Sequence, residues 1–121
     1  MKLLTKEVEK LLPLLYSQEK VEDPVVHVKF FDPCGSWTWL AYEGGWCDGD
    51  GKYVGTQEEA GSNGDYLFFG LVQGFEVELG YFSLKELSSV RGKMGLPLER
   101  DLYFKPVPLS QVRAKLYGVG V

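Results

Sequence analysis

The spacing of hydrophobic positions changes several times along the chain and predicts a series of short helices and strands. Apolar residues recur at helical spacing from Leu4 to Leu15, with Thr5 placed as an N-cap and Pro13 as a stop. Farther on, β-branched and aromatic residues form short runs that end at turn residues, as strands do. The predicted helices cover residues 5–12, 84–91 and 109–116, and the predicted strands cover residues 25–31, 36–42, 66–72, 75–82 and 100–105.

Turn residues join four of these strands in pairs. Residues 32–35, Asp-Pro-Cys-Gly, match a type I turn, and Gln73-Gly74 matches a two-residue hairpin turn. No βαβ repeat is visible. We therefore expect an α+β fold in which an antiparallel sheet of about five strands, two hairpins plus one strand, carries about three short helices on one face.

Two strands have faces that the sequence pattern predicts. Val26, Val28 and Phe30 should share one face of the first strand. In the strand at 75–82, the buried face should be formed by Phe75, Val77, Leu79 and Tyr81. The alternate positions of that strand are polar or glycine, which is typical of a solvated face.

The segment between the two hairpins has a different composition. A length of 121 residues predicts a single domain, 1–121. Residues 43–64 should form a long acidic Gly-rich loop, because they hold seven glycines and five acidic residues with little periodicity. Residues 43–78 contain eight acidic residues and one basic residue, whereas residues 79–121 contain seven basic and three acidic ones. An acidic surface suits a basic partner, although charged loops also serve solubility alone. The candidate partner-binding residues are Glu43, Asp48, Asp50, Glu58, Glu59, Asp65, Trp46 and Tyr53.

Part of the same segment resembles a calcium-binding loop. Asp48, Asp50 and Glu59 occupy the first, third and twelfth positions of the EF-hand pattern. Lys52 and Tyr53, however, stand at the fifth and sixth positions, where a ligand and a glycine belong. The pattern favours a Gly/Asp turn, and we assign no metal and no cofactor.

Other residues that could carry chemistry are poorly arranged for it. His27, Cys34 and Cys47 do not have the spacing of zinc ligands. His27 beside Cys34 or Ser36 lacks the signature of a nucleophilic site. Paired carboxylates at Glu76 and Glu78 could serve acid–base chemistry, but a solvated strand face carries such residues routinely. We assign no catalytic residue, and the interpretation leans away from an enzyme.

The chain shows no targeting or membrane segment. Charged residues such as Lys6, Glu7 and Glu9 interrupt any apolar core of a signal peptide, and no apolar run approaches the roughly 20 residues of a membrane span. Two cysteines are too few for a disulfide framework. We expect a cytoplasmic protein with free thiols and no membrane partner.

Three stretches of the chain resemble a family of short bacterial proteins catalogued as domain of unknown function 2958. They are residues 28–33 with 37–39, residues 67–87, and residues 95–104. The resemblance covers nearly the whole chain except about residues 44–64. It implies a location on mobile genetic elements such as plasmids and prophages, often near anti-restriction or other anti-defence genes, and it supplies no catalytic residues.

These observations lead to a hypothesis and two alternatives. The hypothesis is a non-catalytic accessory protein of a mobile element that binds a host or defence-system protein through its acidic surface, as an anti-CRISPR or anti-restriction inhibitor would. One alternative is a nucleic-acid-binding accessory protein that uses sheet aromatics with basic residues, namely Arg91, Lys93, Arg100, Lys105, Arg113 and Lys115. The acidic balance of the chain disfavours it. The other alternative is a small enzyme.

Overall fold

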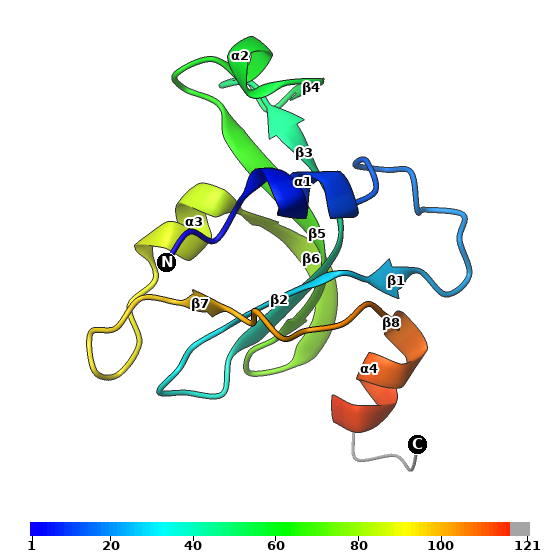
Figure 1. Ribbon diagram of the computed structural model, residues 1–121, viewed down its shortest axis with the longest axis vertical. Coiled ribbons are helices and arrows are strands. Elements are labelled where there is room, and N and C mark those ends of the chain that lie inside the picture. The colour runs from blue at the N-terminus through cyan, green and yellow to red at the C-terminus, as the bar shows by residue number, and fades with distance from the viewer. Residues whose placement is uncertain (117–121) are drawn as a thin grey trace.

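The computed structural model describes residues 1–116 as one antiparallel α+β domain (Figure 1). Its elements are, in chain order, α1 (Lys6–Leu11), β1 (Val25–Val26), β2 (Val28–Phe31), β3 (Thr38–Cys47), β4 (Tyr53–Val54), α2 (Gln57–Ala60), β5 (Asp65–Gln73), β6 (Val77–Ser83), α3 (Leu84–Ser89), β7 (Glu99–Arg100), β8 (Val107–Pro108) and α4 (Leu109–Leu116). The main sheet has the order β6-β5-β3-β2-β7, with β4 paired to the end of β3. Strands β1 and β8 form a separate pair.

Strand β3 forms the centre of the main sheet and is longer than the sequence predicts. It pairs with β2 on one side and with β5 on the other, and a bulge interrupts the second pairing between Ala41 and Glu43. Gly44 and Gly45 belong to this strand, although the sequence pattern assigned them to a loop. A Cβ atom on Gly44 would lie 2.5 Å from the hydroxyl oxygen of Tyr66, so the glycine there makes room for a neighbouring ring.

Residues 43–64 are thus a strand end, a short strand and a helical turn rather than one long loop. Residues up to Cys47 continue β3, Tyr53 and Val54 form β4, and α2 follows. Thr56 caps α2, because its side chain accepts a hydrogen bond from the Glu59 amide.

The predicted helix starts are confirmed by their caps. Thr5 Oγ1 accepts a hydrogen bond from the Val8 amide at 3.2 Å, and Ser83 Oγ accepts one from the Glu86 amide at 3.1 Å. The last helix has the predicted bounds, Leu109–Leu116. Gly118, which the sequence suggests as its terminator, lies outside the described residues.

Helices cover both faces of the sheet, not one. On the first face, Val8 and Leu12 at α1 and Leu87 on α3 pack against Phe30 and Phe68. On the second face, α4 contributes to a separate apolar cluster, which consists of Val26, Leu40, Tyr42, Leu71, Leu109 and Val112. The expectation of helices on a single face is therefore wrong for α4.

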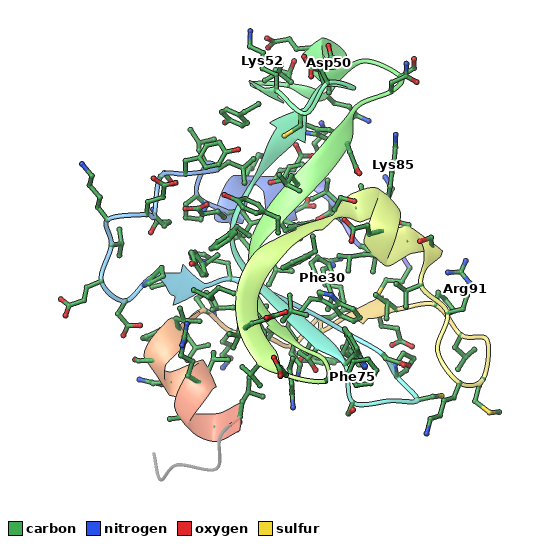
Figure 2. The ribbon with its side chains drawn as sticks, turned by 180° about the vertical axis from the view of Figure 1, so that it is seen from behind. Phe30, Asp50, Lys52, Phe75, Lys85 and Arg91 are labelled. Atoms are coloured by element: carbon green, nitrogen blue, oxygen red, sulfur yellow. The ribbon has the colours of Figure 1, made fainter. Side chains whose placement is uncertain are left out.

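Three strand predictions need correction. The strand at 25–31 is interrupted at His27, so Val26 belongs to the second core while Val28 and Phe30 belong to the first. Strand β6 begins only at Val77, and Phe75 is 95% exposed at the end of the β5–β6 turn (Figure 2). The strand at 100–105 is reduced to Glu99–Arg100, because a turn closes from Asp101 to Phe104.

Candidate interaction face

The residues that follow β3 form a projecting lobe, which we call the acidic lobe (residues 48–64). It contains β4 and α2 and lies at the end of the molecule opposite α4 (Figure 1). Asp50, Glu58 and Glu59 are exposed on it, and Lys52 is its one basic residue. Figure 2 shows Asp50 and Lys52 at the outer end of the lobe. The structure therefore brings three of the predicted acidic residues together on one solvated projection.

Two further predicted acidic residues have structural partners. Asp48 Oδ1 accepts hydrogen bonds from the amides of Asp50 and Lys52, both at 2.9 Å, and so closes the turn before β4. Asp65 Oδ1 accepts from the Lys85 amide at 3.1 Å, in the first turn of α3. Both side chains are half-buried. Their carboxylates hold the backbone and present less charge to a partner than the exposed ones do.

Glu43 does not lie on the surface. Its side chain is 2% exposed, and its two oxygens accept hydrogen bonds from the Tyr16 amide at 2.9 Å and the Gln18 amide at 2.8 Å. The backbone of Tyr16 has a φ of 69°, a conformation that residues other than glycine rarely adopt. Glu43 thus fastens the segment after α1 to the central strand, and it cannot take part in an exposed acidic surface as predicted.

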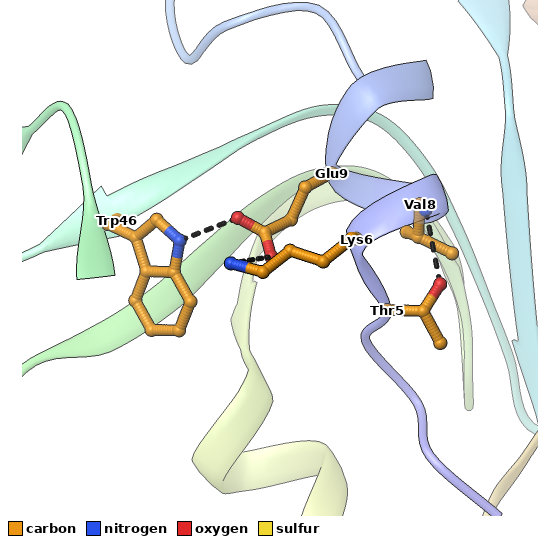
Figure 3. Close-up of polar contacts among 5 residues, drawn as sticks. All are labelled: Thr5, Lys6, Val8, Glu9 and Trp46. Carbon is orange, nitrogen blue, oxygen red and sulfur yellow. Dashed lines mark hydrogen bonds and ion pairs between the residues drawn. The ribbon is translucent and has the colours of Figure 1, made fainter.

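Trp46 points to the first face of the sheet, away from the other predicted residues. Its indole nitrogen donates a hydrogen bond to Glu9 Oε1 at 2.9 Å (Figure 3). Its ring packs edge-on against Tyr66. The other oxygen of Glu9 lies 3.9 Å from the Lys6 ammonium. Trp46 therefore anchors α1 to β3, and its role is structural in this arrangement.

The candidate metal ligands are not brought together in the part of the chain that the structure describes. Within residues 1–116, no group of three or more His, Cys, Asp or Glu side chains is placed to hold a metal ion. Cys47 is buried and Cys34 is exposed, and both are free thiols. Glu76 and Glu78 are exposed near the start of β6 and line neither of the two grooves described below.

A row of aromatic rings extends from the acidic lobe across the second face of the sheet. Tyr53 on β4 meets Tyr16 edge-on at 6.4 Å between ring centroids, and Tyr16 meets Tyr81 on β6 at the same distance. Tyr81 contacts Phe69 on β5 at 4.6 Å, and Phe69 contacts Tyr42 on β3 at 5.5 Å. We call these five residues the aromatic row. Tyr16 and Tyr81 are 43% and 51% exposed, so the row is not simply part of the core.

The aromatic row leads into an open groove beside α4, which we call the tyrosine groove. Its floor is formed by Tyr42, Phe69 and Leu79, and its volume is about 860 Å³. Glu19 and Glu22 line one side, and Arg113 of α4 lines the other. The acidic lobe, the aromatic row and the tyrosine groove together make up the interaction face.

Burial affects the tyrosines of this face. It raises the pKa of Tyr42, and the nearby Glu43 carboxylate raises it further. Burial also raises the pKa of Tyr81, with smaller contributions from Tyr16, Glu43 and Glu19. A phenol with its ordinary pKa of about 10 is protonated at neutral pH, and the upward shifts strengthen this, so both phenols can donate hydrogen bonds.

Most of this face was missed from the sequence, although Tyr53 was among the candidates. Leu79 and Tyr81 alternate with polar residues and were therefore assigned to a buried face. They are partly exposed because β6 is the edge strand of the sheet. Tyr16, Glu19 and Glu22 lie in a polar segment that gave no signal beyond a loop. The alternation of apolar and polar residues in β6 was the one available sign of this surface. Whether the apolar side of β6 is buried or exposed depends on the position of the strand in the sheet.

The fold and its surface define a small antiparallel α+β domain with open grooves on both sides of α4. No helix within residues 1–116 is both long enough and apolar enough to cross a membrane. The sequence profile of the family described as "Protein of unknown function (DUF2958)" matches residues 3–115, so the chain belongs to this family. No curated protein and no solved structure matches the chain.

Proposed function

We propose that this protein is a non-catalytic binding protein that docks its interaction face onto a basic surface of another protein. The observation that carries the proposal is the aromatic row, which is continuous from the acidic lobe to the tyrosine groove. Half-exposed tyrosines supply a large contact area at low entropic cost, and they are typical of protein-binding surfaces.

The charges around the aromatic row favour a basic partner. Asp50, Glu58 and Glu59 are exposed on the lobe at one end, and Glu19 and Glu22 lie beside the groove near the other. Complementary charge increases the rate of association and selects the orientation of docking, while aromatic groups supply most of the contact energy. This division of roles assigns orientation to the carboxylates and affinity to the tyrosines.

The proposed biological setting follows from the family resemblance. We place the protein in the cytoplasm as an accessory protein of a mobile genetic element. The acidic and aromatic chemistry of this face suits a host or defence-system protein with a basic nucleic-acid-binding groove. Such a protein is the kind of target that an anti-CRISPR or anti-restriction inhibitor would bind.

Nucleic acid is a weaker candidate for this face. Three of the basic residues of the C-terminal third lie apart from one another: Arg91 follows α3, Arg100 lies in β7 and Arg113 lines the tyrosine groove. Lys105 and Lys115 lie outside the interaction face. A continuous basic track of the kind that binds single strands is therefore not formed on the interaction face.

A capture experiment with matched variants tests the proposal. Tagged wild-type protein and the variant Leu79→Ala/Tyr81→Ala are used to capture partners from host extract, with quantitative mass spectrometry as the readout. Because both side chains are partly exposed, the variant should keep the fold. We expect the partner to be depleted about tenfold or more by this variant, and a protein captured equally by both would contradict the proposal.

A second pair of variants separates the contribution of charge. Asp50→Asn/Glu58→Gln should slow association and flatten its dependence on salt, because exposed charges act mainly through steering. The matched control Glu76→Gln/Glu86→Gln removes two exposed charges elsewhere on the surface and should leave binding unchanged. Equal effects of the two pairs would show that net charge, not this face, determines binding.

A further inference from the structure

A second groove lies on the same face of the sheet, on the other side of α4. We call it the lysine groove. Lys29 of β2, Lys105 of the segment before β8, and Lys115 of α4 line it, and its volume is about 690 Å³. The two grooves use different sides of the helix, since Arg113 faces the tyrosine groove and Lys115 faces this one.

The charges of the lysine groove are unbalanced in favour of the positive sign. Asp101 is the one carboxylate among the lining residues that the structure describes, and Asp101 Oδ1 already accepts a hydrogen bond from the Tyr103 amide at 2.9 Å. Within residues 1–116, the one ion pair joins Lys6 and Glu9, so no side-chain carboxylate of these residues lies within ion-pair distance of the three lysines. Lys29 Nζ contacts the Phe31 ring, 5.9 Å from its centroid, a cation–π contact that leaves the positive charge in place. Three ammonium groups in one groove of a chain of net charge −4 are suited to an anion.

The other lining residues suit a ligand that also carries an aromatic ring. Tyr103 is 91% exposed at the edge of the groove, so its ring has a free face. The floor is apolar, with Leu40 from the sheet and Val112 from α4. Aromatic side chains stack on nucleic-acid bases with little preference for sequence, because every base has a π-face.

The surroundings favour a short ligand over a polymer. A groove of about 690 Å³ lies in the usual range of roughly 300–1,000 Å³ for small-molecule sites. A nucleic-acid strand leaving it across α4 would meet Glu19, Glu22 and Asp23 at the tyrosine groove. Those carboxylates repel phosphate and so disfavour a strand that continues across α4.

We propose that the lysine groove binds a nucleoside triphosphate, with the lysines around its phosphates and Tyr103 against its base. The proposal is independent of the protein partner, because it uses none of the residues of the interaction face.

Calorimetric titration of the whole protein with ATP tests this site. We expect saturable binding that Lys29→Gln/Lys115→Gln weakens by about tenfold or more and that Tyr103→Ala also weakens. Inorganic triphosphate and adenosine should each bind more weakly than ATP, since each carries only part of the ligand. The control Lys85→Gln/Lys93→Gln removes the same charge from exposed positions outside the groove and should leave ATP binding unchanged.

Three results would overturn the proposal. One is the absence of heat at millimolar ATP with a protein whose circular dichroism shows it folded. Another is an equal weakening of ATP binding by the Lys29→Gln/Lys115→Gln variant and the Lys85→Gln/Lys93→Gln control, which would indicate a general attraction of anions. The third is tighter binding of a single-stranded oligonucleotide than of ATP through the same lysines, which would assign the groove to nucleic acid.

Discussion

Glu43 should be among the most important polar side chains for the stability of this domain. It is buried in the central strand, and its carboxylate is shared by the amides of Tyr16 and Gln18. Glu43→Gln keeps the shape of the side chain but replaces one acceptor oxygen by an NH₂ group, which opposes a backbone N–H. One amide then loses its acceptor in a buried site, and the other loses the strength that a charged acceptor provides.

The magnitude follows from these two hydrogen bonds. A hydrogen bond to a charged group contributes about 1.5–3 kcal/mol, and leaving a buried donor without a partner costs about 1–3 kcal/mol. Because the buried carboxylate also has a desolvation cost, we expect Glu43→Gln to lower the free energy of unfolding by about 2–3 kcal/mol. For a domain with a total stability of about 5–15 kcal/mol, this is a large fraction.

Urea denaturation followed by tryptophan fluorescence measures this change, and hydrogen exchange localises it. Amides 16 and 18 should lose protection in Glu43→Gln, while Glu58→Gln, an exposed position on α2, should stay within about 0.5 kcal/mol of wild type. A change below about 0.5 kcal/mol in Glu43→Gln, with protection kept at both amides, would refute the structural role assigned to this carboxylate.

Two further predictions concern the sheet and the single histidine. A Cβ atom on Gly70 would overlap the carbonyl oxygen of Leu40 and lie 2.8 Å from the Ala41 Cα. A Cβ atom on Gly80, the partner of Gly70 on β6, would have no neighbour within 4 Å. Thermal denaturation should therefore show that Gly70→Ala is less stable than wild type by about 3 kcal/mol and that Gly80→Ala is nearly unchanged. Burial lowers the pKa of His27, so its contribution to stability is present above the unfolded value of about 6.5 and is lost as the pH falls through the folded pKa. NMR titration of this residue should give a midpoint below about 6.5, and a higher midpoint would contradict the burial.

The sequence predicted most elements because local signals and tertiary structure agree there. The cap at Thr5 and the helical spacing of the apolar residues beside it led to a correct helix start, and turn residues placed both hairpins. The resemblance to the family is confirmed as well.

The failures have physical causes that the sequence pattern does not contain. Gly44 and Gly45 removed the strand signal from the end of β3, because rings of Tyr66 and Tyr53 occupy the space where their side chains would be. Which face α4 covers depends on topology, and the exposure of Leu79 depends on β6 being an edge strand. Composition likewise could not separate exposed acidic residues from those that hold the backbone.

The central proposal is that the interaction face binds a basic protein partner, and an NMR footprint tests it most directly. Titrating the ¹⁵N-labelled protein with the captured partner should shift or broaden amides along the aromatic row, at Tyr16, Tyr53 and Tyr81, and in the acidic lobe. Amides of α1 and α3, on the other face of the sheet, should change little. Changes concentrated on α1 and α3, with the aromatic row unaffected, would contradict the account.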